Sequence, residues 1–444
     1  MLQAGFARVD ITPPLGSPLA GYFTIRYAEG ILDPLELNAV AFSDGERTAV
    51  IISCDLIYVI DPTATEIREQ IAKAAGIPAE CIFLHGLHQH TSIRVGNKPG
   101  IIHADTMRNP SYLSILYRKF CDVTRMAMDD MRPSTLGVAA KETPVPLSFI
   151  RRYRMKDGST RTNPGVLNPD VVGPIGEADN TVRLIRVHRE GAKDIAIVNF
   201  CTHPDVIGGN RISADWPGFV RRLTEEEMPD VWCILVNGPQ GDTNHVAVGN
   251  PAHAGKKTPE ERYAYSRYMG KVISDTALSV WDQTVPVSGE KVYGEVQYCF
   301  IPTNTAGIER FDECVELKRK LDAGEIKLEM GDKAEVNRIA QIRKESLFQR
   351  IPVSVLCVGE IGFVGYGGEP FTQYGVASRE AAPEMFIVAC CLVNGGQGYL
   401  PTREAFEEGG YEAKNSRFTP GLADTVQGEA AEMLARYRAF RNEK

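Results

Sequence analysis

The chain of 444 residues contains no apolar run long enough to cross a membrane. Its longest apolar runs cover residues 231 to 236 and 385 to 393, whereas a membrane-spanning helix needs about 20 such residues. The first residues also lack the basic segment and the following apolar segment of an export signal. These absences predict a soluble protein without a membrane span, located in the cytoplasm.

An excess of positive charge and closely spaced cysteine pairs are missing as well. The formal charge is -8 and the isoelectric point is about 5.6, which argues against nucleic-acid binding, because nucleic-acid-binding surfaces are usually strongly basic. No two of the ten cysteines have the CxxC spacing of a zinc knuckle or a redox pair. Most lie within apolar runs, which predicts reduced core residues. A metal site in this chain would therefore consist mainly of histidine and carboxylate ligands.

Apolar strand-like segments alternate with amphipathic helical segments along the chain, a pattern typical of an α/β fold. Many of the strands are apolar throughout, so we expect a sheet core between helical layers. The predicted strands cover residues 36–42, 48–54, 81–85, 182–188, 194–201, 231–237, 353–358, 361–366 and 385–391. The predicted helices cover residues 63–75, 111–131, 217–228, 259–282, 331–349 and 424–442.

The chain shows no internal repeat and no low-complexity linker, so we expect a single domain over residues 1–444. Residues 286–300 alternate in polarity like an exposed antiparallel strand. Residues 309–349 are charged and helical, which predicts a helical excursion on the surface. A solvated face explains charge runs of this kind in most proteins, and partner binding is the alternative.

Polar residues follow five of the predicted strands, at the edge where α/β sheets bind ligands. Each position alone has a plain structural interpretation: a hydrogen-bonded histidine pair, a capping histidine or a bare turn. Five such strand ends together favour one shared cavity, and an HxH pair on an extended segment points both imidazoles to one side. The strand ends carry His88 with His90, His203, Asp242 with Asn244, Glu369, and Tyr399.

Nine short motifs occur in order between about residues 5 and 415. They are ARVDITPP near the start, CD at 54–55, HxHTS at 88–92, RR at 151–152, CTHP at 201–204, ISADWPG at 212–218, NGxxGD at 237–242, GEPF at 368–371 and GYLPT at 398–402. In this set and order the chain resembles the neutral (non-lysosomal) ceramidases and their wider family. The resemblance implies a mixed β-sheet core flanked by helices, like the ceramidase catalytic domain.

The resemblance also implies a catalytic zinc ion, Zn(2+). In the family the metal is held by the first His of the HxH element, the His of the THP-like element, a Glu and a Tyr. His90 would lie beside the water bound to the metal, and Arg151 and Tyr411 match positions that approach the polar part of the substrate. Carried over by matching motif, the implied ligands are His88, His203, Glu369 and Tyr399.

Departures from the family pattern set the expectation for the substrate. The loop HQHTSIRVGNKPG replaces the family's HTHSGPGG, and Asn244 stands where the family has a Ser that approaches the substrate amide. The immunoglobulin-like C-terminal domain and the secretion signal of ceramidases are missing from this sequence. We therefore expect a small, soluble substrate that is more polar than ceramide.

The predicted reaction is hydrolysis of an amide (C-N) bond, since zinc lowers the pKa of bound water to about 7 and so supplies hydroxide at neutral pH. His90 would carry the proton to the leaving amine, and Glu369 has a second interpretation as general base. An ester or lactone hydrolase with the same zinc site is one alternative, because an activated hydroxide does not distinguish the two leaving groups. A non-catalytic binding protein is the other, which the change at Asn244 allows.

Two sets of charged residues complete the predicted site. Asp55 follows a predicted strand and either fixes the tautomer of a ligating histidine or caps the strand end. A group of cations on loops would suit a substrate with a carboxylate or phosphate, with surface solvation as the plain alternative. This group consists of Arg94, Lys98, Arg108, Arg151 and Arg152.

Overall fold

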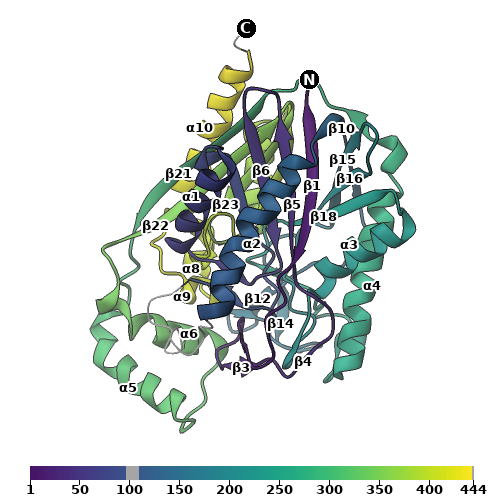
Figure 1. Cartoon of the computed structure of the whole chain (residues 1–444). Helices are drawn as coiled ribbons and strands as arrows, with labels where there is room; N and C mark the ends of the chain where they lie inside the picture. The colour runs from purple at the N-terminus through teal and green to yellow at the C-terminus, as the bar shows by residue number, and fades with distance from the viewer. Residues whose placement is uncertain (97–109, 443–444) are drawn as a thin grey trace.

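Two β-sheets form the centre of the computed structural model, which describes residues 1–96 and 110–442 (Figure 1). The larger sheet has the strand order β18-β16-β15-β10-β1-β5-β6-β8, with β20 added beside β10. Its strands are β1 (Gln3–Asp10), β5 (Glu36–Ser43), β6 (Thr48–Cys54), β8 (Ile82–Gly86), β10 (Arg132–Glu142), β15 (Thr181–Arg189), β16 (Asp194–Phe200), β18 (Val231–Asn237) and β20 (Val285–Pro286). The smaller sheet has the order β21 (Val292–Pro302), β22 (Phe348–Val358), β23 (Ile361–Tyr366) and β25 (Phe386–Cys390).

Both sheets are mixed. The pairs β6 with β8, β16 with β18 and β23 with β25 are parallel, and the other neighbours within the two sheets are antiparallel. The inner faces of the sheets pack on each other through one apolar cluster, in which Phe6 and Phe83 of the larger sheet meet Phe363 and Val388 of the smaller one. Residues of these strands are therefore buried on both sides, which is why the sequence reads as continuously apolar there.

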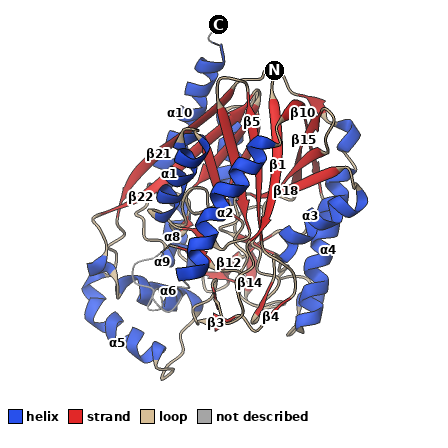
Figure 2. Ribbon diagram, in the orientation of Figure 1, coloured by secondary structure: helices blue, strands red, loops and turns tan. Residues whose placement is uncertain are grey.

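Helices cover the two outer faces (Figure 2). One half of the larger sheet packs under α1 (Thr63–Ala75) and α2 (Pro110–Asp129), and the other half under α3 (Asp215–Glu227) and α4 (Pro259–Leu278). The smaller sheet packs under α7 (Thr372–Ala381) and α10 (Leu422–Asn442). The layers thus run helix, sheet, sheet, helix. Within the described residues, none of the helices combines the length and the apolar character that crossing a membrane requires.

The close packing of α2 on the sheet depends on one glycine in β1. A Cβ atom at Gly5 would lie 2.0 Å from the carbonyl oxygen of Ala127 in α2. No side chain fits in that space, so glycine is required here for the helix to lie against the strand.

The larger sheet divides into two arms, because β1 pairs with β10 only at Gln3 and Ala4. Polar side chains join the arms below this point: the Ser53 hydroxyl of β6 donates to the carbonyl of Leu235 in β18 at 2.6 Å. The fully buried Asp55 and Arg221 form a bidentate ion pair in the same region, with N to O distances of 3.0 and 2.5 Å. A buried pair with this geometry fixes α3 against the end of β6.

A smaller lobe lies apart from the sheets at the lower left of Figure 1 and contains α5 (Phe311–Asp322) and α6 (Met330–Ile339). Its own apolar cluster centres on Cys314, Val336 and Ile339. Helix α6 packs on α9 (Tyr411–Asn415), which connects the lobe to the rest of the chain.

Short elements occupy the loops between these layers. They are β2 (Pro18–Leu19), β3 (Arg26–Tyr27), β4 (Gly30–Ile31), β7 (Tyr58–Val59), β9 (Arg94–Val95), β11 (Phe149–Ile150), β12 (Arg152–Met155), β13 (Thr160–Thr162), β14 (Val171–Pro174), β17 (Arg211–Ile212), β19 (Thr243–Asn244), β24 (Glu369–Pro370), β26 (Tyr399–Leu400), α8 (Arg403–Glu408) and α9.

The predicted α/β class is confirmed, and each of the nine predicted strands is present. Sequence patterns missed β1 and β10, and they did not indicate the division into two sheets. The predicted helix over 331–349 is too long: α6 ends at Ile339 and the chain enters β22 at Phe348. The alternating segment at 286–300 corresponds mainly to β21, an edge strand antiparallel to β22.

Candidate metal centre

The HxH element leaves the larger sheet at the end of β8. His88 has a φ angle of 76°, in the left-handed region that non-glycine residues rarely adopt. Its Nδ1 atom lies 3.0 Å from the carbonyl oxygen of Ile57. The intervening Gln89 donates to the Asp55 carboxylate at 2.6 Å. The segment is thus held on both sides, and the Nε2 atom of His88 is directed away from the strand.

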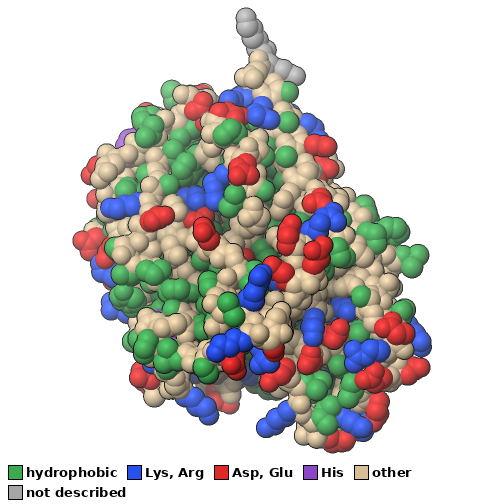
Figure 3. All heavy atoms as spheres, turned by 180° about the vertical axis from the view of Figure 1, so that it is seen from behind, with side chains coloured by type: hydrophobic (Ala, Val, Ile, Leu, Met, Phe, Trp, Pro, Cys, Tyr) green, Lys and Arg blue, Asp and Glu red, His purple; other side chains and the backbone are tan. Residues whose placement is uncertain are grey.

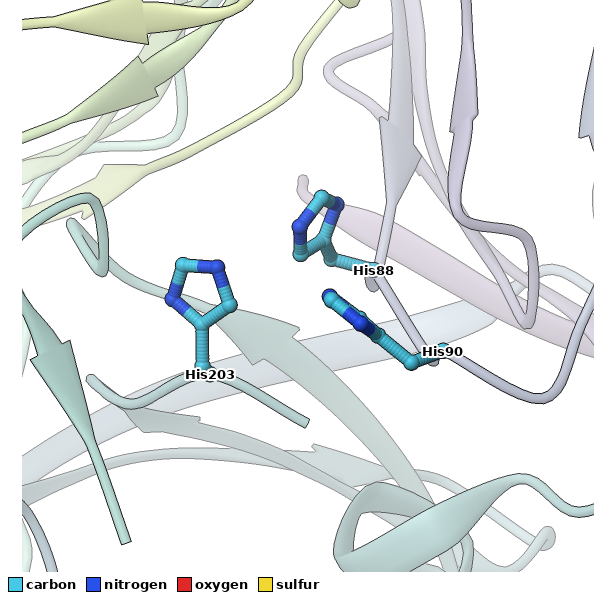
Figure 4. Close-up of side chains that lie close together, drawn as sticks. All are labelled: His88, His90 and His203. Atoms are coloured by element: carbon cyan, nitrogen blue, oxygen red, sulfur yellow. The ribbon is translucent and has the colours of Figure 1, made fainter. Parts of the chain in front are cut away.

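His203 follows β16 and points to the same place (Figure 4). Its Nδ1 atom lies 2.8 Å from the carbonyl oxygen of Gln240, in the loop after β18. Burial, together with the nearby Arg151 guanidinium, lowers the pKa of His203 to about 3. The imidazole is therefore neutral at pH 7, with its hydrogen on Nδ1 and a lone pair on Nε2.

Glu369 and Tyr399 come from the smaller sheet's side of the molecule. They are direct partners in the parallel pairing of β24 with β26. The Oε2 atom of Glu369 lies 3.3 Å from Nε2 of His88 and 3.3 Å from Nε2 of His203. Tyr399 stacks on His203 with ring centroids 6.5 Å apart.

The arrangement of these atoms fits a bound cation. A carbonyl oxygen can only accept a hydrogen bond, so the Nδ1 atoms of His88 and His203 carry the hydrogens and both Nε2 atoms are acceptors. They face Glu369 Oε2, a third acceptor, which is buried and has no hydrogen-bond donor among the described residues. Arg151 is a donor at the edge of this group, with Nη1 3.4 Å from His203 Nε2. A metal ion between the three acceptors would satisfy them together.

His90 is the third imidazole of this cluster. Ligand atoms of His88, His90 and His203 all lie within 4.8 Å of one another, and all three side chains are buried (Figure 4). Burial and the neighbouring His88 lower the pKa of His90 well below its ordinary value. The geometry therefore offers the metal an imidazole in addition to the ligands that the resemblance implies.

Three residues around His90 were missed by sequence reasoning. Asp205 places its Oδ1 atom 3.4 Å from His90 Nδ1 and accepts a hydrogen bond of 2.6 Å from the Tyr22 hydroxyl. Tyr22 packs edge-on against the imidazole, with centroids 5.4 Å apart. Gly21 allows this approach, since a Cβ there would lie 2.7 Å from His90 Cγ. Of the three, only Asp205 could have been found from the sequence, because it lies two residues after His203 in the same loop.

Arg151 lies beside His203, and Tyr411 lies beside Tyr399. Arg151 uses Nε for an ion pair of 2.7 Å with the fully buried Glu412 and donates from Nη2 to the carbonyl of Gly241 at 2.8 Å. Its remaining terminal nitrogen, Nη1, is the one directed at His203. The ring of Tyr411 lies 5.4 Å from that of Tyr399, and burial raises its pKa to about 12. Both groups are therefore hydrogen-bond donors at neutral pH.

The residues after β18 have other contacts. Asn244 donates from its amide to Asn163 at 2.7 Å and accepts from the Val246 amide. Asp242 accepts two hydrogen bonds of 2.9 Å from the amide and hydroxyl of Thr372 at the start of α7. Burial raises the pKa of this carboxyl to about 6. Asp242 thus anchors a helix N-terminus.

The other charged residues are placed as follows. Asp55 pairs with Arg221 and positions the HxH segment through Gln89. Arg94 is buried in β9, and Arg152 donates to Glu408 at 3.1 Å. The predicted Lys98 and Arg108 fall outside the described residues.

Hydrogen bonds tie the strand ends of the two sheets together at the centre. The amide of Asn237 donates to His85 Nε2 at 2.8 Å, and the amide of Cys391 donates to the Asn237 carbonyl at 3.1 Å. The amide of Gly86 donates to the carbonyl of Leu392 at 3.1 Å. The ends of β8, β18 and β25 are therefore held in fixed relative positions.

No protein-family model matches the chain, and no curated protein sequence matches it. Its fold does match solved structures. Neutral ceramidase from Pseudomonas aeruginosa matches over 100% of this chain and 75% of its own length, with a TM-score of 0.72 and 16% sequence identity. A ceramidase in complex with C2 matches over 99% and 75%, with a TM-score of 0.72 and 14% identity. The chain therefore has a ceramidase-like fold, as the motifs predicted.

Proposed function

We propose that this chain, which has a ceramidase-like fold, is a zinc-dependent hydrolase that cleaves an amide bond in a small molecule more polar than ceramide. The observation that carries the proposal is the convergence of His88 Nε2, His203 Nε2 and Glu369 Oε2, with 3.3 Å from the carboxylate oxygen to each nitrogen. We assign these three groups and Tyr399 as the metal ligands. Imidazole and carboxylate ligands of this kind are typical of catalytic zinc sites.

A zinc ion held there would supply an activated water near neutral pH and polarise the carbonyl of the substrate. The chain's own groups complete the chemistry. His90 is neutral at pH 7 and can accept a proton on one ring nitrogen while Asp205 orients the other. Arg151 Nη1 and the Tyr411 hydroxyl can donate to negative charge that develops on the carbonyl oxygen.

Two observations support the rest of the proposal. The Asn244 amide stands where ceramidases have a hydroxyl, and polar side chains around it, such as Asn163 and Thr162, suit a polar substrate. All ten cysteines are free and nine are buried, which fits a reducing compartment such as the cytoplasm.

The test is a panel of soluble N-acyl amides and matched esters, assayed with zinc-loaded protein and with a chelated sample. We expect zinc-dependent amide cleavage that His90→Ala abolishes while zinc stays bound. Equal rates in the loaded and chelated samples would refute the metal mechanism. Ester cleavage without amide cleavage would replace the amidase by an esterase, and protein that cannot be loaded with zinc would support a binding protein.

A further inference from the structure

A cavity of about 590 Å³ lies between the α5–α6 lobe, the loop after β2 and the segment around Gly398. Its volume is that of a typical small-molecule site. Apolar walls come from Phe23, Leu321 and Ile342. Figure 3 shows charged side chains of both signs intermixed over the lower right of the back face, where the lobe lies.

The cavity adjoins the metal centre. Tyr22 lines the cavity and also packs on His90, and Gly398 lines it directly before Tyr399. A row of rings leads inward from the other wall. The centroid of Phe23 lies 6.3 Å from that of Tyr411, which is itself in contact with Tyr399. A substrate in the cavity can therefore reach the imidazoles with one end while the other end stays beside the lobe.

Most of the charges in the cavity wall are already compensated. Arg338 donates to three backbone carbonyls, at 3.0 Å each. Arg417 is paired with Glu345, and Lys318 with Asp322 at 2.9 Å. These contacts account for three of the four cations and for both carboxylates of the described wall.

Lys333 of α6 is the fourth cation, and the one side-chain contact that it makes among the described residues is with an aromatic ring. Its ammonium lies 4.5 Å from the centroid of Phe23, whose side chain is 46% exposed. A cation over a half-exposed ring presents a positive charge next to an apolar surface. This is the chemistry that recognises a carboxylate at the end of an apolar or aromatic segment.

We propose that this cavity binds the far end of the substrate, and that this end is an anionic carboxylate on an apolar segment, held by Lys333 and Phe23. The inference rests on the proposed hydrolase and specifies its substrate class. The carboxylate lies several bonds from the amide that is cleaved, because the rings of Phe23, Tyr411 and Tyr399 separate Lys333 from the imidazoles.

The experiment measures binding of an uncleavable probe, so that its outcome does not depend on hydrolysis. Isothermal titration of the full chain with 6-phenylhexanoate and with the uncharged 6-phenylhexan-1-ol compares the carboxylate with a group that has no charge and no amide or ester bond. We expect the acid to bind roughly tenfold more tightly, as about 1.4 kcal/mol of charge recognition requires. Lys333→Gln should remove that difference, and Lys333→Arg should restore most of it.

Two controls make the test decisive. Lys320→Gln removes the same charge from α5 at a position paired with Glu316 and outside the cavity wall, and it should leave both affinities unchanged. Titrations with and without a zinc chelator separate the cavity from a carboxylate bound at the metal. Binding that chelation abolishes and Lys333→Gln leaves intact would overturn the inference, as would equal affinities for the acid and the alcohol. If the probe binds as expected but no amide is cleaved, the hydrolase proposal fails and the binding site stands.

Discussion

The metal centre and the α5–α6 lobe are held together by different kinds of interaction. In the centre, buried groups from distant parts of both sheets meet through hydrogen bonds such as the one from the Cys391 amide to the Asn237 carbonyl. In the lobe, exposed pairs three or four residues apart predominate, such as Arg319 with Glu316 and Lys318 with Asp322. Buried contacts between distant segments are individually costly to lose, whereas exposed local pairs contribute little.

In our proposal the centre carries out the hydrolysis, whereas the α5–α6 lobe contributes to binding of the substrate. Imidazoles that must stay within a few tenths of an ångström need the rigid strand ends, and the lobe can vary without disturbing them. If that is correct, substitutions in the centre should be severe and matched substitutions in the lobe mild.

The largest effect is expected from Glu369→Gln. The substitution removes the charged oxygen that lies 3.3 Å from both Nε2 atoms. Loss of a group outside the ligand set typically costs about 10- to 100-fold in metal affinity, so loss of the carboxylate itself should cost at least about 100-fold. Competition with a chelator gives the affinity, and amide hydrolysis should fall with it. Glu316→Gln in the lobe is the control, and a comparable loss there would contradict the comparison.

Asp55→Asn should give the largest loss of stability. It leaves Arg221, which is 1% exposed, with its ion pair to Glu36 at 3.3 Å and without its bidentate partner, and the loss of one partner of a buried pair costs about 3–5 kcal/mol. Urea denaturation measures the free energy of unfolding. The matched change Asp322→Asn breaks an ion pair of the lobe and should cost less than about 1 kcal/mol. Equal costs would show that burial does not set the difference.

Acid should weaken the sheets before it weakens the lobe. Burial lowers the pKa of His85 from 6.5 to about 4, so the folded state binds its proton less readily than the unfolded state. Its contribution is fully present above pH 6.5 and is lost as the pH falls toward 4, by about 3 kcal/mol. His85→Gln should flatten the pH dependence of the unfolding free energy. No histidine occurs in residues 311–340, so no imidazole of the lobe contributes to this slope.

Gly21→Ala should have the smallest effect on stability and still lower activity. Its φ angle of 98° makes alanine strained by about 1–3 kcal/mol, and the new Cβ would press on His90. Gly16→Ala is the control, because Gly16 has a φ angle of 82° and a Cβ added there would meet no atom within 4 Å. Gly21→Ala should lose at least as much stability as Gly16→Ala because of its contact with His90, but only Gly21→Ala should slow hydrolysis. Equal activities would remove the role assigned to the loop over His90.

The positions of the strand ends could be predicted from the sequence, because apolar runs that stop at His88, His203 or Glu369 are local signals. The approach of Tyr22 and Asp205 to His90 could not, since it depends on how the loop after β2 folds back over the imidazole. The division into two sheets could not be predicted either, because it too depends on contacts between distant parts of the chain. The strands that line the interface are apolar on both sides, and periodicity does not tell which face meets a helix and which meets a sheet.

The proposed set of metal ligands depends on the resemblance as well. Nothing in the spacing around Tyr399 distinguishes a ligand from a core phenol. Asp242 shows the converse: a carboxylate after a buried strand and a glycine-rich turn is here the anchor of α7. A polar residue after a strand is a candidate site residue, and its hydrogen-bond partners in the structure show whether it has a structural role instead.

The backbone of His88 has a consequence for how the protein can evolve. Glycine adopts a φ angle of 76° without steric cost. The same left-handed conformation lowers the stability of the folded state by on the order of 1–3 kcal/mol when the residue is histidine. Selection for thermal stability alone would therefore favour His88→Gly and lose the imidazole. If the proposed metal site is correct, a lineage that keeps histidine at this position carries that cost for metal binding, and the identity of residue 88 would mark the relatives that keep the site.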